Sequence, residues 1–187
     1  RRHGVDAAIF FSDIMVPLRL AGVDVEIKPQ VGPVLSTPIR TRDDVERLLG
    51  CGFGQGTWAS HDGATHQGAE GVAALREAIA LILTELGTPA QALKQGLPQP
   101  TDWTPLIGFG GAPFTLAAYL VEGKPSRDHL AARSLMHADP PTWDLLMCWC
   151  AQVTGDFIAL QISCGASAAQ LFDSWAGSLS PTDYRER

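Results

Sequence analysis

Polar residues whose side chains could take part in binding or catalysis follow two short apolar runs of this sequence. Asp13 comes directly after the run that contains Phe10 and Phe11, and Ser174 follows a later run near the end of the chain. The carboxylate of Asp13 has roughly four lone-pair positions and could accept several N–H groups that converge from a ligand. Apolar neighbours such as Phe10, Phe11 and Ile14 would desolvate it unless such donors were supplied. The spacing therefore makes Asp13 a candidate site residue.

The same residues have simpler interpretations that the sequence leaves open. Aspartate and serine are common helix N-caps, so Asp13 or Ser12 could accept backbone N–H groups of a following helix. No Gly-x-Ser-x-Gly turn surrounds Ser174, which argues against a serine hydrolase. Tyr119 could pack its ring in the core or direct its hydroxyl toward the ends of the strands.

A glycine-containing segment at 109–114 precedes a helix start and would let a ligand approach the backbone. Its spacing matches neither the P-loop nor the dinucleotide-binding fingerprint, so nucleotide binding is disfavoured.

Metal binding is also disfavoured. His61 and His66 lie in a segment rich in glycine and glutamine, with no third ligand near them in sequence. The chain has four cysteines without the paired spacing of a zinc ribbon or a disulfide scaffold, so we expect reduced thiols. Cys148 and Cys150, two apart on a predicted helix, should point to different faces and not share an ion.

The elements that must position these residues alternate between strand and helix. Buried strands are predicted at 7–11, 106–109 and 168–172, each followed by a loop and a helical pattern. Such alternation predicts a parallel sheet with helical crossovers, in the α/β class. Three strand–helix units can form only an arc of an eight-stranded barrel, and we expect exposed sheet edges. We treat 1–187 as a single domain.

The predicted helices are amphipathic and have recognisable ends. They cover 72–86, ending at Gly87; 112–122, ending at Gly123; 126–137, with Ser126 as N-cap; and the segment from Pro140 to Gly165. Residues 51–71 and 88–103 lose the pattern and are predicted to be surface loops.

The composition excludes several function classes. The 187 residues carry a formal net charge of -6, which argues against a broad nucleic-acid surface and means that an anionic ligand would need a local cluster of cations. No run reaches the roughly 20 continuous apolar residues that cross a bilayer, and no export signal is visible. We expect a cytoplasmic protein without a membrane partner.

Four motifs, in order, resemble the uroporphyrinogen decarboxylase family. They are Phe-Ser-Asp-Ile at 11–14, Pro-Leu-Ile-Gly-Phe-Gly-Gly-Ala-Pro-Phe-Thr-Leu at 105–116, Tyr-Leu-Val-Glu-Gly at 119–123 and Leu-Phe-Asp-Ser-Trp-Ala-Gly at 171–177. The resemblance implies a (β/α)8 TIM barrel, usually a homodimer, of which this chain would be an internal fragment with about three βα units. It implies a carboxy-lyase that uses no metal or organic cofactor.

The resemblance also implies roles for individual residues. Asp13 matches the aspartate that binds the pyrrole N–H groups of uroporphyrinogen, and Tyr119 matches the tyrosine that orients a reacting acetate. Ser174 matches a position that hydrogen-bonds a substrate carboxylate, while Phe11 and Phe172 would line the apolar face against the macrocycle. The resemblance further places arginines before residue 1 and a histidine after residue 187, so we expect this chain alone to be inactive.

Two alternatives remain at this stage. A cobamide-dependent methyltransferase would share the barrel but would hold zinc with histidine and cysteine, and no such cluster follows the third strand. A truncated protein that only binds porphyrins is the other.

Overall fold

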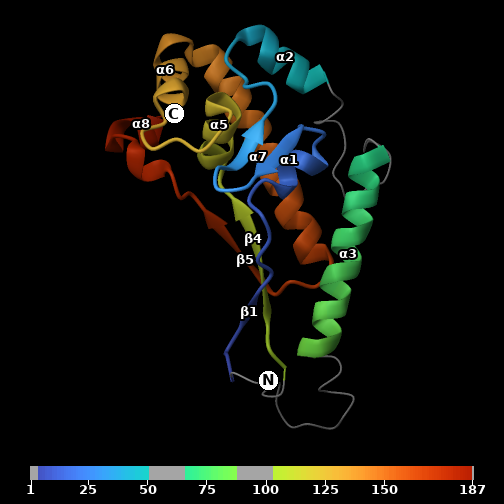
Figure 1. Ribbon diagram of the computed structural model, residues 1–187. Helices are drawn as coiled ribbons and strands as arrows, with labels where there is room; N and C mark the ends of the chain where they lie inside the picture. Colours follow the sequence, from blue (N-terminus) through green and yellow to red (C-terminus); the bar gives the residue numbers. More distant parts are fainter. Residues whose placement is uncertain (1–3, 51–65, 88–102, 187) are drawn as a thin grey trace.

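The core of the protein is a parallel sheet of three strands in the order β1-β4-β5. The computed structural model describes residues 4–50, 66–87 and 103–186. The strands are β1 (Ala8–Ile9), β4 (Leu106–Gly111) and β5 (Ala168–Phe172), and Figure 1 shows them side by side. The three predicted strands and their parallel pairing are therefore confirmed. The predicted burial holds for most of β4 but is wrong for β5, whose five residues are all exposed because no layer covers the other face of the sheet.

Strand β1 is shorter than predicted because its ladder with β4 stops early. The Phe10 N–H still donates to the Ile107 carbonyl at 2.8 Å, but the Phe11 N–H turns back to the Ile9 carbonyl at 2.8 Å. That turn removes the chain from the ladder before Phe109 is reached.

Helices follow the strands and lie along one side of the sheet and beyond its carboxyl end (Figure 1). They are α1 (Val16–Leu20), α2 (Arg42–Gly50), α3 (His66–Leu86), α5 (Pro113–Glu122), α6 (Leu130–Ala138), α7 (Pro140–Ser163) and α8 (Pro181–Glu186), with a 3-10 turn at Ala176–Ser178.

Helix α7 is the central packing element. The Asp139 carboxylate caps its start by accepting the Thr142 N–H at 3.2 Å, and Gly165, with φ 112°, follows its end. Apolar residues recur every three or four positions from Leu146 to Cys164, a pattern that predicts one buried helix face, and all but the half-buried Cys164 are buried. The fully or nearly fully buried residues of this face are Leu146, Cys150, Val153, Phe157 and Leu160.

By length and composition alone, α7 would be long and apolar enough to cross a membrane. Half of its most apolar stretch of 18 residues is buried inside the fold, which is typical of the core helix of a globular protein. Length and composition are therefore weak support for a membrane span.

Two local predictions were wrong. The helix expected from Ser126 begins at Leu130, because the Ser126 hydroxyl caps only a turn, accepting the His129 N–H at 3.2 Å. The first N–H groups of α6 are satisfied from α5 instead, where the Glu122 carboxylate accepts those of Ala131 and Ala132 at 2.8 and 3.1 Å. A distant side chain thus replaced the expected local cap.

The other wrong prediction concerns the start of α3. Residues 66–71 are helical although they were assigned to a loop, while the rest of that loop and the segment 88–102 lie outside the described residues. Gly71 allows α3 to lie against α1, since a Cβ there would collide with the Leu20 side chain. Packing outweighs low helix propensity at this position.

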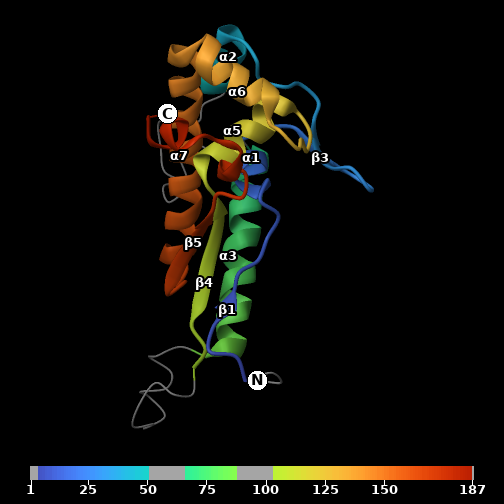
Figure 2. The ribbon, with the colours of Figure 1, turned by 90° about the vertical axis from the view of Figure 1, so that its left-hand side faces the viewer.

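A hairpin that the sequence analysis did not predict joins α1 to α2. Strands β2 (Val25–Lys28) and β3 (Gly32–Leu35) pair antiparallel, and Figure 2 shows β3 extending away from the body of the molecule. The hairpin is anchored at its base, where the Leu35 N–H donates to the Gly123 carbonyl at 2.8 Å.

The face of the sheet opposite the helices is open. All five residues of β5 are exposed, as are Ile9 and Phe11 at the β1 edge. Open edges and an uncovered face are what an arc of a barrel predicts.

Candidate active site

Three phenylalanines form an aromatic surface on the open face of the sheet, in which the buried ring of Phe109, 5% exposed, lies between the exposed rings of Phe11 and Phe172. The Phe109 ring centroid lies 5.3 Å from that of Phe11 and 5.1 Å from that of Phe172. Phe11 is 81% exposed and Phe172 39% exposed, although such rings normally bury their area. The structure thus brings two predicted residues together and adds Phe109, which the sequence analysis did not select.

Strand alternation decides which rings face the opening. Phe10 is buried in the core, and its neighbour Phe11 points to the opposite side. The β4–β5 register pairs Gly111 with Phe172, and Phe109 lies two residues before Gly111 on the same face. This period of two was the signal that could have identified Phe109 from the sequence.

Buried side chains from α7 fix the backbone beneath this aromatic surface. The Gln161 amide accepts the Phe109 N–H at 2.9 Å and donates to the Phe109 carbonyl at 2.8 Å. The Thr154 hydroxyl donates to the Gly111 carbonyl at 2.9 Å. These bonds take the place of a longer β1 ladder, so the Phe109 ring is held by α7 rather than by β1.

Asp13 lies at the end of β1 and is exposed rather than surrounded by apolar side chains. The expected desolvation is therefore wrong for this structure, because Phe10 turns into the core and Phe11 onto the open face. One carboxylate oxygen accepts the Met15 N–H at 2.8 Å, just before α1. The capping interpretation accounts for that one bond. The other oxygen has no hydrogen-bond partner among the described residues and is available to a ligand.

Tyr119 belongs to a stack of three rings. Its centroid lies 3.9 Å from that of Trp175, and Trp175 lies 4.3 Å from His129. Burial raises the pKa of Tyr119, and the negative charge of Asp13 raises it further. Asp13 and Tyr119 are thus electrostatic neighbours, and the phenol stays protonated as a hydrogen-bond donor at neutral pH.

The loop after β5 carries Ser174 and Trp175 and is tied to the start of α5. The Thr115 hydroxyl donates to the Asp173 carboxylate at 2.8 Å and accepts the Trp175 N–H at 3.4 Å. Asp173 is thereby used in anchoring the loop. Ser174 is exposed and lines an open cavity of about 470 Å³, of which Trp175 forms a wall.

The predicted residues therefore lie at the same end of the sheet, in partly separate groups. Phe11 and Phe172 both contact the ring of Phe109, whereas the charge of Asp13 acts on the Tyr119 hydroxyl. Ser174 is linked to Tyr119 only through Trp175, and its cavity is lined by neither Asp13 nor Tyr119. The roles of these residues stay predictions.

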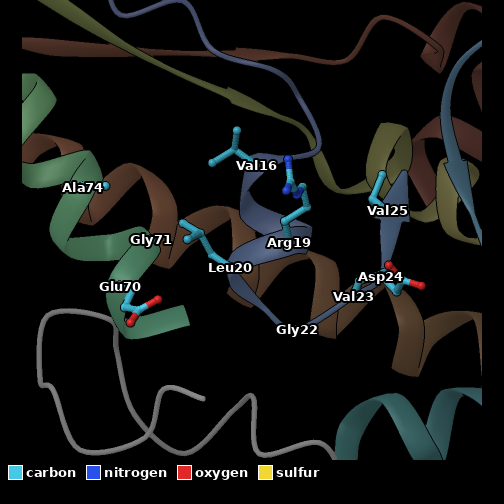
Figure 3. A pocket seen from close by; sticks show the side chains of 10 residues that line it. All are labelled: Val16, Arg19, Leu20, Gly22, Val23, Asp24, Val25, Glu70, Gly71 and Ala74. Atoms are coloured by element: carbon cyan, nitrogen blue, oxygen red, sulfur yellow. The ribbon is translucent and has the colours of Figure 1, made fainter. Parts of the chain in front are cut away.

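A larger cavity of about 740 Å³ lies elsewhere, between α1 and α3. Figure 3 shows Arg19 and Leu20 from α1 and Glu70 and Gly71 from α3 at its wall. None of the predicted site residues lines it, so its size alone does not make it the candidate site.

Three cysteines lie in the described part of the chain, and each is a free thiol there. Cys148 is exposed and Cys150 is buried on the other side of α7, as the two-residue spacing predicted. Burial raises the pKa of the Cys150 thiol. Within residues 4–50, 66–87 and 103–186, no group of three histidine, cysteine, aspartate or glutamate side chains is placed to hold a metal; His61, Cys51 and the His66 side chain lie outside what is described.

The arrangement defines a segment of an α/β barrel with an open aromatic face at the carboxyl ends of its strands. A family model described as uroporphyrinogen decarboxylase (URO-D) matches residues 1–187, and the chain belongs to this family.

Comparison with curated relatives supports the same family. The chain is 53% identical to uroporphyrinogen decarboxylase of Arthrobacter sp. (strain FB24) over 99% of this chain and 45% of the relative. It is 54% identical to that of Leifsonia xyli subsp. xyli over 100% of this chain and 42% of the relative. The chain therefore spans less than half the length of the curated relatives it matches.

A solved methyltransferase from Methanosarcina mazei has a similar fold. The TM-score is 0.64 over 98% of this chain and 45% of that one, with 15% sequence identity. This similarity concerns the fold alone and supports the partial-barrel architecture.

Proposed function

We propose that the protein to which this chain belongs is a carboxy-lyase that removes carbon dioxide from the four acetate side chains of uroporphyrinogen III and releases coproporphyrinogen III. The observation that carries the proposal is the aromatic surface of Phe11, Phe109 and Phe172, with Asp13 and Tyr119 at the same end of the sheet. A flat apolar surface beside a free carboxylate oxygen suits a macrocycle with N–H groups at its centre.

The chemistry follows from where charge develops. Loss of carbon dioxide leaves an electron pair on carbon, and a pyrrole ring protonated beforehand would accept that pair without an added cofactor. A proton from solvent then adds to this carbon to complete the methyl group, and the ring loses the proton that it had gained. In this proposal the Asp13 carboxylate accepts hydrogen bonds from the pyrrole N–H groups and stabilises the positive charge of the protonated pyrrole ring. The protonated Tyr119 hydroxyl donates a hydrogen bond to the reacting acetate, and the Ser174 hydroxyl donates to a further carboxylate. Phe11 and Phe172 support the ring faces.

Asp13→Asn tests the proposal. The amide oxygen can still accept the Met15 N–H, so the turn before α1 is kept while the charge is lost. We expect decarboxylation by the complete protein to fall at least about 100-fold, the usual effect of removing a group aimed at developing charge. The melting temperature should change little.

Asp24→Asn is the matched control. Asp24 is also exposed and its carboxylate also accepts one hydrogen bond, from the Ser36 hydroxyl at 2.9 Å, but it lies at the hairpin. Its activity should equal that of the wild type. An Asp13→Asn protein with wild-type rates would refute the assigned role of Asp13.

We further propose a homodimer that acts in the cytoplasm without a metal or organic cofactor, as the family resemblance implies. A cobamide-dependent methyltransferase remains the alternative suggested by the shared barrel. Stoichiometric zinc in the purified protein would favour that alternative.

A further inference from the structure

The open cavity beside Ser174 is rich in hydrogen-bond donors. Its wall contains Arg127 and Arg133 at the start of α6, and it has a volume of about 470 Å³. The complete lining, from the α5–α6 segment and the loop after β5, is Ser126, Arg127, Asp128, His129, Arg133, Ser174, Trp175, Gly177 and Ser178.

Neither arginine has a salt-bridge partner within the described part of the chain, although the charge of Arg133 helps to lower the pKa of Asp183. Arg127 is exposed and takes part in no ion pair there, and the same holds for half-buried Arg133. The Nε of Arg133 is buried without a hydrogen-bond partner, which is costly for a charged donor. Asp128 is the single carboxylate in the lining, so the two arginines outnumber the carboxylates of the cavity.

The other polar groups in the lining carry no negative charge. Burial lowers the pKa of His129, so its imidazole is neutral at neutral pH. Its Nδ1 lies 3.2 Å from the Ser178 hydroxyl, which donates to the Trp175 carbonyl at 2.8 Å. Ser174, by contrast, is exposed and its hydroxyl has no hydrogen-bond partner among the described residues, so it is a third free donor.

We propose that this cavity is a carboxylate-binding subsite in which Arg127, Arg133 and Ser174 hold one side-chain carboxylate of the tetrapyrrole. The inference rests on the proposed function and extends it to residues that determine substrate affinity. A guanidinium pair with a serine hydroxyl matches the planar geometry and charge of a carboxylate.

The position of the cavity connects it to the candidate active site. The Trp175 ring stacks on Tyr119 at 3.9 Å and also forms a wall of the cavity. A ligand that reaches from the aromatic surface past Tyr119 would therefore meet the two arginines on the far side of Trp175. Because the chain carries a net charge of -6, a polyanionic ligand depends on such a local cationic group.

The test uses the complete protein with Arg127→Gln and Arg133→Gln, and Lys124→Gln as the matched control. Lys124 is an exposed cation three residues before Arg127 and does not line the cavity. The probes are uroporphyrin III and coproporphyrin III, whose binding is followed by fluorescence. Each arginine change should weaken binding and raise the KM for uroporphyrinogen about tenfold, the effect of one charge-assisted hydrogen bond. The value of kcat should stay within about twofold, and Lys124→Gln should match the wild type in both.

The two probes separate the acetate from the propionate side chains. Weaker binding of both porphyrins assigns the subsite to a propionate, because coproporphyrin III lacks the acetates, and weaker binding of uroporphyrin III alone assigns it to an acetate. Both results support the subsite.

Other outcomes overturn it. If the arginine variants bind and react as Lys124→Gln does, or lose kcat with KM unchanged, the subsite is refuted while the proposed decarboxylation stands. If the wild type releases no carbon dioxide but binds porphyrin in an arginine-dependent manner, the proposed function fails and the subsite stands. Arg127→Gln keeps the test decisive even where Arg133→Gln misfolds, since Arg127 is exposed.

Discussion

Replacement of Gln161 by leucine should destabilise the protein through the backbone of Phe109. Gln161 is fully buried and its amide makes bonds of 2.9 and 2.8 Å to the N–H and carbonyl of Phe109. Leucine has a similar volume but offers neither a donor nor an acceptor, so both backbone groups would be left without partners.

The magnitude follows from these two groups. A buried group left unsatisfied costs about 1–3 kcal/mol, so two cost about 2–6 kcal/mol. The larger apolar area of leucine offsets part of this, and we expect a net loss of about 3 kcal/mol in the free energy of unfolding. With a urea m-value of about 2 kcal/mol/M, the midpoint should fall by about 1.5 M.

Urea unfolding of the wild type and three variants measures this effect. Thr154→Val removes a single hydrogen bond to the Gly111 carbonyl and should cost about half as much as Gln161→Leu. Gln152→Leu, an exposed change on the same helix that breaks only a bond to Asp156, should cost less than about 1 kcal/mol. If Gln161→Leu unfolds at the same midpoint as Gln152→Leu, the reasoning that α7 replaces the missing β1 ladder is wrong.

Two further predictions concern titration and reactivity. Burial lowers the pKa of His129 in the folded protein below its unfolded value of about 6.5. The unfolded chain therefore takes up a proton first as the pH falls below about 6.5, and the free energy of unfolding should decrease. The decrease should be complete once the pH is below the folded pKa. His129→Asn keeps a residue that tolerates the positive φ of 48° and should abolish this part of the pH dependence in urea titrations at pH 7 to 5; an unchanged pH profile would contradict it. Iodoacetamide at pH 8 should modify Cys148 in the native protein but Cys150 only after unfolding, because Cys150 is buried and its pKa is raised. Equal native labelling of both thiols, read by mass spectrometry, would refute the buried placement of Cys150.

Local patterns in the sequence were sufficient for most of the secondary structure. The apolar runs at 106–109 and 168–172 became β4 and β5, and the glycines at 123 and 165 ended α5 and α7 as predicted. These features depend on side-chain periodicity and backbone dihedral angles over a few residues, which the chain carries locally.

Local patterns failed where a distant group supplied the decisive bond. The start of α6 is set by Glu122 rather than by Ser126, and the early end of β1 is tolerated because Gln161 satisfies Phe109. Neither partner can be recognised from neighbouring residues, since each lies at the end of another element.

The sequence by itself determined the family, the three parallel strands, the main helices between them and the identities of Asp13, Tyr119, Phe11, Phe172 and Ser174 as candidates. Only the tertiary structure decided how they are grouped. It placed Phe109 between two rings, stacked Trp175 between Tyr119 and His129, and left Asp13 exposed. The physical reason is that the direction of a side chain depends on strand register and on helix packing, and both are fixed by contacts between residues far apart in the chain.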